Sequence, residues 1–145
     1  MRPPNLDTIG LEAALRDMVE NAARYGHLKY HFEFIKEDDL QVCDEVRIVL
    51  YRVVQEGLNN ILKHAKATRV DVVLKRGIQN ITLNIKDNGC GFVQTQQRSI
   101  EHIGLLSMQD SVAYLGGQFT VKSKLGEGTV ITVTCPKVIY GEIQR

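Results

Sequence analysis

The order in which helical and strand periodicities follow one another restricts the folds open to this chain. Apolar residues recur at helical spacing in three segments: 11–26, 44–65 and 105–115. Alternating or β-branched runs predict five strands: 28–35, 69–75, 81–87, 119–124 and 129–135. Helices and strands do not alternate strictly, as they would in a doubly wound sheet. The order predicts an α+β fold, with one mixed sheet, its helices on a single face, and a hairpin turning at Arg76-Gly77.

Length, charge and cysteine content narrow the class of protein. A chain of 145 residues, 43% hydrophobic and 24% charged, suits one ordered domain. Eighteen basic against seventeen acidic residues remove the electrostatic basis for binding nucleic acid or an anionic membrane. Cys43, Cys90 and Cys135 form neither a disulfide framework nor a metal knuckle, which favours a reducing compartment. With no secretory signal and no bilayer-spanning run, we expect a cytoplasmic domain.

The second predicted helix carries polar side chains on one face. At about 100° per residue, four of them project within roughly a 100° arc: Glu56, Asn60, Lys63 and His64. A carboxylate can serve as a base, and an amide oxygen is a ligand that Mg²⁺ accepts beside phosphates and water. Spacing alone favours an ordinary solvated face, so the set is a candidate site only.

Three glycine-containing segments follow, each with a plainer reading. The run Asp87-Asn88-Gly89-Cys90-Gly91-Phe92 after a strand suits close approach to a planar ligand, or a simple turn. Residues 102–108 open a helix whose free amides suit a phosphate, or merely place a glycine cap. Residues 126–129 read as a hairpin turn. No segment completes a dinucleotide fingerprint or a Walker loop.

The order of these segments is more specific than any one of them. Residues 55–65 resemble the N box of sensor histidine kinases, and residues 87–92 resemble their G1 box. Residues 104–108 resemble the G2 region, and residues 126–129 the closing Gly-Thr. The chain therefore resembles the ATP-binding catalytic domain of the superfamily that gyrase, Hsp90, histidine kinases and MutL share. This implies a Bergerat-type fold, a two-layer α/β sandwich that binds ATP.

The resemblance also implies a domain organisation and a subfamily. Residues 1–10 would be the linker from an upstream dimerization domain, 11–138 the ATP-binding domain and 139–145 a tail. The run Leu50–Glu56, with Lys63-His64-Ala65, is similar to kinases whose partners are NarL-type response regulators.

On the purine side, the resemblance implies contacts from several residues. Asp87 would accept a hydrogen bond from the adenine amino group, and Thr129 would support it through water. Gly89 and Gly91 would let the chain pass beside the purine. Gly128 is a further residue of the implied nucleotide site, and His64 would stack near the adenine.

On the phosphate side, the resemblance implies that Asn60 coordinates Mg²⁺ and that Lys63 meets a phosphate. Glu56 would polarise the attacking imidazole or a water molecule. The amides of Gly104 and Leu105 would approach the phosphates. His102 stands where the family's first G2 glycine is usual, which alters this part of the expected lid.

The four histidines lack the His-Asp or His-Glu context of the family's phosphate acceptor. We therefore expect a chain that binds ATP with Mg²⁺ but does not phosphorylate itself. Its partners would be the parent's dimerization domain and a NarL-type regulator, with no direct contact to nucleic acid or membrane, and the isolated domain would be monomeric. A nucleotide-binding module without transfer and an anti-sigma-factor serine kinase are the alternatives.

Overall fold

The computed structural model describes residues 6–37, 42–91 and 105–137, apart from the side chains of residues 6–9, 64 and 65. In chain order the elements are α1 (Leu6–Gly26), β1 (Lys29–Lys36), α2 (Asp44–Asn60), the π-helical turn η1 (Ile61–Ala65), β2 (Arg69–Arg76), β3 (Asn80–Asp87), α4 (Leu105–Tyr114), β4 (Gln118–Lys124) and β5 (Gly128–Pro136). None of the helices described here has the length and hydropathy that crossing a membrane requires.

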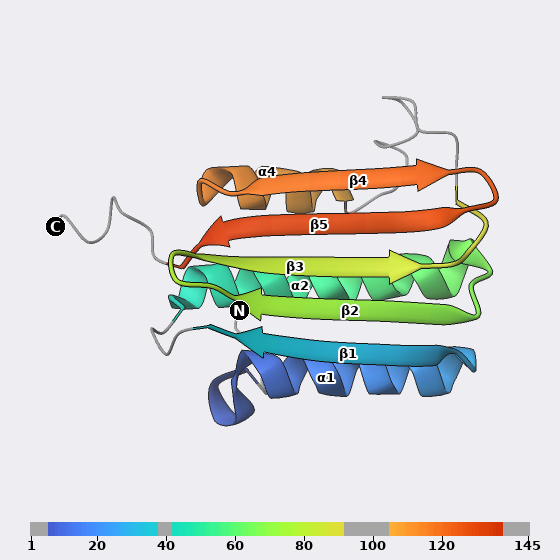
Figure 1. Ribbon diagram of the computed structural model, residues 1–145, viewed down its shortest axis with the longest axis horizontal. Coiled ribbons are helices and arrows are strands. Elements are labelled where there is room, and N and C mark those ends of the chain that lie inside the picture. The colour runs from blue at the N-terminus through green and yellow to red at the C-terminus, as the bar shows by residue number, and fades with distance from the viewer. Residues whose placement is uncertain (1–5, 38–41, 92–104, 138–145) are drawn as a thin grey trace, which may run out of the picture.

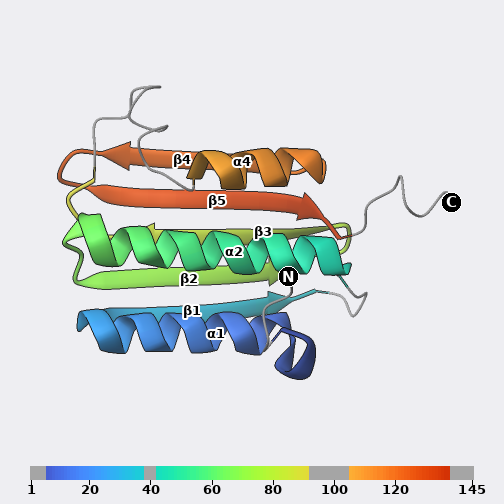
Figure 2. The same cartoon turned by 180° about the vertical axis from the view of Figure 1, so that it is seen from behind.

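The strands form one five-stranded sheet in the order β1-β2-β3-β5-β4. β1 pairs with β2 in parallel, and the remaining neighbours pair antiparallel. The α-helices of the described residues all cover the same face of the sheet, as Figures 1 and 2 show from opposite sides. The predicted α+β class, mixed sheet and hairpin between β2 and β3 are confirmed.

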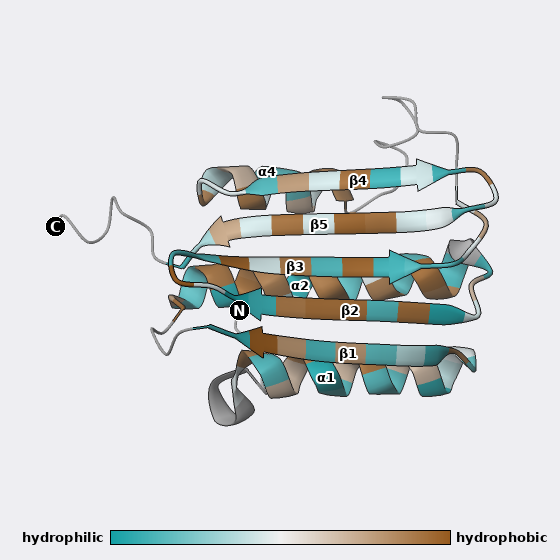
Figure 3. Cartoon of the chain, in the orientation of Figure 1, coloured by the Kyte–Doolittle hydropathy of each residue, from teal (hydrophilic) through white to brown (hydrophobic). Residues whose placement is uncertain are grey.

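The core lies between this helical layer and the sheet. Apolar and polar residues alternate along β3 and β4 (Figure 3), so each strand turns one row of side chains toward the helices. The buried stripe of α2 packs on that row through Val46, Leu50, Val53, Val54, Gly57 and Leu58. At Gly57 a Cβ would lie 3.1 Å from Cδ1 of Ile85. The absence of a side chain there lets α2 lie close to β3.

Two helices differ from the predicted boundaries. α1 begins at Leu6 rather than Leu11, and Gly10, with φ 81° and ψ 168°, breaks it into two parts. That conformation is open to glycine because it has no Cβ. α2 stays α-helical only to Asn60, and the predicted last turn is π-helical, ending at Lys66 in a left-handed conformation. Hydrophobic spacing does not distinguish one wider turn at the end of a helix from another α turn.

Candidate functional site

The predicted site residues of α2, β3 and β5 gather at one end of the sheet. α2 leads through η1 and residues 66–68 into the start of β2, and the antiparallel pairing places the end of β3 beside that start. Asp87, the last residue of β3, is opposite Val70 on one side and Thr129 of β5 on the other. In Figures 1 and 2 the C-terminal end of α2 lies over this end of the sheet.

Asp87 is a buried carboxylate held by backbone donors. Its side chain belongs to a residue only 6% exposed, and its Oδ1 accepts a hydrogen bond of 2.8 Å from the amide of Gly89. Burial raises the pKa of Asp87 above its ordinary value, and hydrogen bonds from the amides of Gly89 and Thr129 oppose that shift. Because the carboxylate is fixed and largely shielded from water, it presents a strong acceptor to any ligand that brings a donor.

Gly91 and Gly128 bring two backbone segments into contact around Asp87. Both have positive φ, 61° and 85°. A Cβ on Gly128 would lie 2.1 Å from the carbonyl oxygen of Asp87, and one on Gly91 would lie 2.1 Å from that of Lys124. The amide of Gly126 donates to the carbonyl of Cys90 at 2.6 Å. The chain after β3 and the β4–β5 turn therefore meet so closely that a side chain at either glycine cannot be accommodated without a backbone shift.

Two positioning residues were not among the predicted site residues. The hydroxyls of Ser123 and Thr129 lie 2.9 Å apart, and Ser123 Oγ also donates to the carbonyl of Gly128. Asn88 Oδ1 accepts from the amides of Thr68 and Arg69, both at 2.9 Å. Asn88 thus ties the end of β3 to the segment that leaves α2. An Asn directly after a strand was the available signal, since its side chain readily bonds to backbone.

The helix side of the site carries polar groups at several depths. Glu56 and Asn60 are half-buried on α2, and Lys63 is exposed in η1. The Nδ2 atom of Asn60 is buried and has no hydrogen-bond partner among the described residues. Leaving a buried amide nitrogen without a partner costs free energy, and an acceptor atom of a bound ligand would satisfy it. The wider turn of η1 also shifts Lys63 from the angular position that a continuous α-helix would give it.

Some predicted residues lie outside the described structure. These are His102, Gly104 and the side chain of His64. Leu105 begins α4, and its side chain is buried in the core. Only the backbone of Leu105 can therefore contact a ligand, because the amides in the first turn of a helix have no partner within the helix.

The described residues suit a ligand with a donor at one end and anionic charge at the other. Asp87 offers an acceptor in a shielded position, while Asn60 and Lys63, farther along the same end of the molecule, offer an amide and an ammonium group. An aminopurine nucleotide has this distribution of donors and charge.

Comparison with known proteins supports this assignment. Residues 43–139 match the family described as histidine kinase-, DNA gyrase B- and HSP90-like ATPases. The chain is 34% identical over 139 residues to the signal transduction histidine-protein kinase/phosphatase DegS of Bacillus subtilis (strain 168), covering 93% of this chain and 36% of that protein. It is 33% identical over 138 residues to the oxygen sensor histidine kinase NreB of Staphylococcus carnosus (strain TM300), covering 94% and 39% respectively.

A solved structure supports the same fold. The histidine kinase domain from the blue-light activated histidine kinase of Erythrobacter litoralis EL346 superposes with a TM-score of 0.66 at 21% identity, covering 87% of this chain and 60% of that one. The chain spans little more than a third of the curated relatives. Since the family match includes every element from α2 to β5, the chain belongs to the histidine kinase-, DNA gyrase B- and HSP90-like ATPases.

Proposed function

We propose that this chain binds ATP with Mg²⁺ and is the catalytic domain of a sensor histidine kinase. In that role it transfers the γ-phosphoryl group to a histidine on a separate dimerization domain. The observation that carries the proposal is the family match over residues 43–139, because that span contains both sides of the site just described. The names of the curated relatives, both histidine kinases, support the choice of this branch of the family.

Asp87 recognises adenine in this proposal. Its carboxylate accepts a hydrogen bond from the exocyclic amino group, while the amides of Gly89 and Thr129 keep it in place. Thr129, held by Ser123, supports the same contact through water. Gly89 and Gly91 let the chain pass beside the purine, Gly128 lets the β4–β5 turn lie against the backbone of Asp87, and His64 stacks near the purine. Guanine, with a carbonyl oxygen where adenine has its amino group, would face the carboxylate with an acceptor and be rejected.

The end of α2 holds the phosphates. Mg²⁺ neutralises charge on the phosphate oxygens when bound, and a metal of this kind needs few protein ligands because phosphates and water complete its shell. Asn60 fits such a group, since its amide oxygen is a ligand that Mg²⁺ accepts, and its buried Nδ2, without a partner in the described structure, can donate to a phosphate oxygen. Lys63 meets a phosphate from η1, and the amides of Gly104 and Leu105 approach the phosphates from the start of α4.

Transfer itself requires positioning more than covalent chemistry from this chain. The imidazole nitrogen of the acceptor attacks the γ-phosphorus, the bond to the β–γ bridging oxygen breaks, and ADP leaves. Glu56 polarises the attacking imidazole by accepting a hydrogen bond from its other nitrogen. The half-buried position of Glu56, one turn before Asn60, supports this role.

The partners follow from the same proposal. They are the dimerization domain of the parent kinase, which supplies the histidine, and a NarL-type response regulator, which takes the phosphoryl group from it. The isolated domain is monomeric and cytoplasmic, and it contacts neither nucleic acid nor membrane.

Two measurements test the proposal. Calorimetric titration with ATP, ADP and GTP, with and without Mg²⁺, should show tighter binding of the adenine nucleotides and an effect of Mg²⁺ on ATP. Incubation with labelled ATP should label an added dimerization-domain protein with an acid-labile phosphate and leave this chain unlabelled. ATP binding without transfer to any dimerization domain of a related kinase would favour a non-transferring module. Capture of an added sigma factor by this chain in a pull-down would favour an anti-sigma-factor serine kinase.

A further inference from the structure

Ser123 is a buried hydroxyl that holds the first two residues of β5. It is the last inward-facing residue of β4, only 7% exposed, and lies opposite Thr129 in the register of the hairpin. Its Oγ donates to the carbonyl oxygen of Gly128 at 3.1 Å and lies 2.9 Å from Oγ1 of Thr129. Thr129 is also opposite Asp87 on β3, and its amide donates to the Asp87 carboxylate. Ser123 is thus one residue removed from the acceptor that the proposed function assigns to adenine.

The hydroxyl protons of Ser123 and Thr129 can be assigned by counting donors. A carbonyl oxygen only accepts, so the contact with Gly128 uses the single hydroxyl proton of Ser123. The contact between the two hydroxyls then needs the proton of Thr129, donated to Oγ of Ser123. The reverse assignment would set the oxygen lone pairs of Ser123 against the carbonyl of Gly128, a buried residue, and cost free energy. Both contacts are hydrogen bonds only when Thr129 donates to Ser123.

This assignment restricts what Thr129 can offer to a ligand. With its one proton directed to Ser123, its Oγ1 has only lone pairs for other partners. The charged carboxylate of Asp87 likewise only accepts. A water molecule between these two acceptors, which lie opposite each other on neighbouring strands, gives one proton to each. It then turns only lone pairs toward the base, as Asp87 itself does.

We propose that Ser123 is a positioning residue that sets the preference of the nucleotide site for a purine with an amino group at position 6. The inference rests on the proposed function, which places the base beside Asp87 and Thr129. The amino group of adenine has two N–H donors, one for Asp87 and one for the water. A purine with oxygen at position 6 brings lone pairs to the same place and meets only acceptors. Ser123 acts through Thr129, by keeping the hydroxyl proton of that residue away from the base.

Removing the hydroxyl of Ser123 should release this restriction. In Ser123→Ala the proton of Thr129 has lost its acceptor on β4 and can be donated to the water. The water then has a proton to spare, which it can donate to an oxygen at position 6. Discrimination against such a base should therefore fall, whereas a role of Ser123 in folding alone would weaken the binding of every nucleotide equally.

Calorimetric titration with ATP and inosine triphosphate (ITP) in the presence of Mg²⁺ tests the proposal, since ITP has oxygen where ATP has the amino group. The measured quantity is the ratio of the ITP to the ATP dissociation constant. We expect the unaltered chain to bind ATP more tightly, and Ser123→Ala to reduce the ratio about tenfold. Thr129→Val, which removes the other hydroxyl, should reduce it to a similar extent, and adding Ser123→Ala to Thr129→Val should change it no further.

An unchanged ratio in Ser123→Ala, or an equal further change in the Thr129→Val background, would overturn the proposal. If Ser123→Ala fails to fold, an unchanged ratio in Thr129→Val overturns it as well. Failure of the unaltered chain to bind either nucleotide would refute the proposed function itself. Equal binding of ATP and ITP would instead refute the selection of an amino group and leave nucleotide binding in place.

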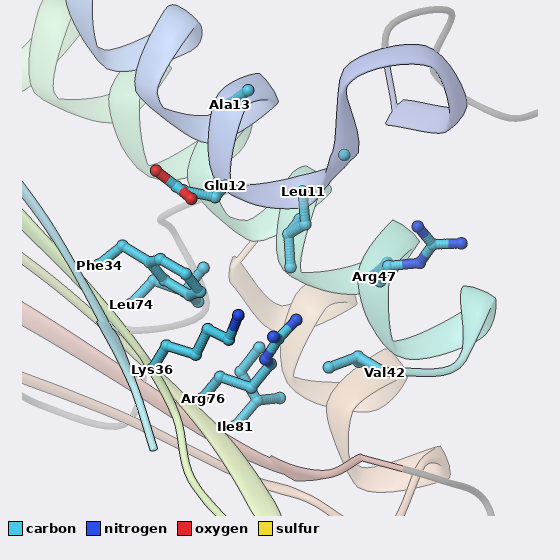
Figure 4. A pocket seen from close by; sticks show the side chains of 11 residues that line it. Leu11, Glu12, Ala13, Phe34, Lys36, Val42, Arg47, Leu74, Arg76 and Ile81 are labelled. Carbon is cyan, nitrogen blue, oxygen red and sulfur yellow. The ribbon is translucent and has the colours of Figure 1, made fainter. Parts of the chain in front are cut away.

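Two control variants separate this effect from a loss of stability or of a hydroxyl elsewhere. Ile81 lies near the start of β3, at the far end of that strand from Asp87, and lines the cavity shown in Figure 4. Ile81→Val should lower the Tm, because it leaves space in the core, without changing the ratio. Thr120→Val removes an exposed hydroxyl from β4 and should also leave the ratio unchanged. A changed ratio in either control would overturn the assignment of the effect to the contact between Ser123 and Thr129.

Discussion

Comparing Gly128→Ala with Gly126→Ala separates two reasons for a glycine in the β4–β5 turn: the close approach of the turn to Asp87, and the positive φ that glycine adopts easily. Gly128 and Gly126 have nearly the same φ, 85° and 82°. A Cβ at Gly128 would lie 2.1 Å from the carbonyl oxygen of Asp87, whereas a Cβ at Gly126 would have no heavy atom within 4 Å. Gly126→Ala is therefore a matched control with the same backbone strain and free space.

The expected magnitudes follow from these distances. A non-glycine residue at such φ costs about 1–2 kcal/mol, which is the whole expected loss for Gly126→Ala. At Gly128 the Cβ would be about 1 Å inside ordinary contact, so backbone must move, and overpacking of this kind adds about 1–3 kcal/mol. The carbonyl that must move belongs to Asp87 itself. We therefore expect Gly128→Ala also to weaken ATP binding about tenfold or more, whereas Gly126→Ala leaves the affinity nearly unchanged.

Urea denaturation of both variants gives the difference in free energy of unfolding, and titration with a fluorescent ATP analogue gives the affinity. If the two variants lose the same stability and the same affinity, the close approach of Gly128 to Asp87 does not constrain the site, and the reasoning fails.

Three further predictions concern the polar residues of the site. Burial raises the pKa of Asp87, so the folded state binds the proton of this carboxyl more tightly than the unfolded chain does. Above the raised pKa, the buried negative charge of Asp87 lowers the free energy of unfolding. This loss of stability disappears as the pH falls through the raised pKa and below the unfolded value of about 3.9. ATP affinity, measured by calorimetry, should accordingly decline in acid at a higher pH than an ordinary carboxyl would give. The variant Asp87→Asn should bind ATP about ten- to a hundredfold more weakly and without this pH dependence. An equally steep decline in the variant would assign the titration to another group. Asn60→Ala should reduce the Mg²⁺-dependent part of ATP affinity about tenfold. The free energy of unfolding should stay within about 0.5 kcal/mol of that of the unaltered chain, because the substitution removes a buried amide atom that has no partner in the described structure. The same Mg²⁺ dependence as in the unaltered chain would remove Asn60 from the metal site. Glu56→Gln should keep ATP affinity and slow transfer to a dimerization domain about a hundredfold or more, measured with labelled ATP, and an unchanged rate would exclude Glu56 as the polarising group.

Much of the fold could be predicted because its signals are local. The helix before Gly116-Gly117 ends where Gly116 adopts φ 80°, and the two strands around residues 125–127 pair in an antiparallel hairpin as predicted. The strand order could not be obtained this way, since the insertion of β5 between β3 and β4 depends on contacts between segments far apart in sequence. The break at Gly10 and the π-helical turn after Asn60 were missed for a different reason. Each changes the backbone geometry without changing the spacing of apolar residues.

The contacts of the site residues were only partly accessible from the sequence. The motif order indicated Asp87 and the glycines, but not that Gly128 lies against the backbone of Asp87 or that Ser123 holds Thr129. Those contacts require the register of the β4–β5 hairpin, which places Ser123 opposite Thr129.

The rows of side chains that face the helices explain why the site forms at this end of the sheet. In β3 the inward row is Ile81, Leu83, Ile85 and then Asp87, and in β5 it begins with Thr129 before Ile131 and Val133. In β4 the row ends on Ser123, which is buried and paired with Thr129. Each row thus has a polar residue as its last member at the same end of the sheet. The strand period alone would put Asp87 on the core face, where an unpaired carboxylate is unfavourable. A sequence that keeps an acid at such a position sacrifices stability there, and this is the behaviour expected of a residue retained for binding.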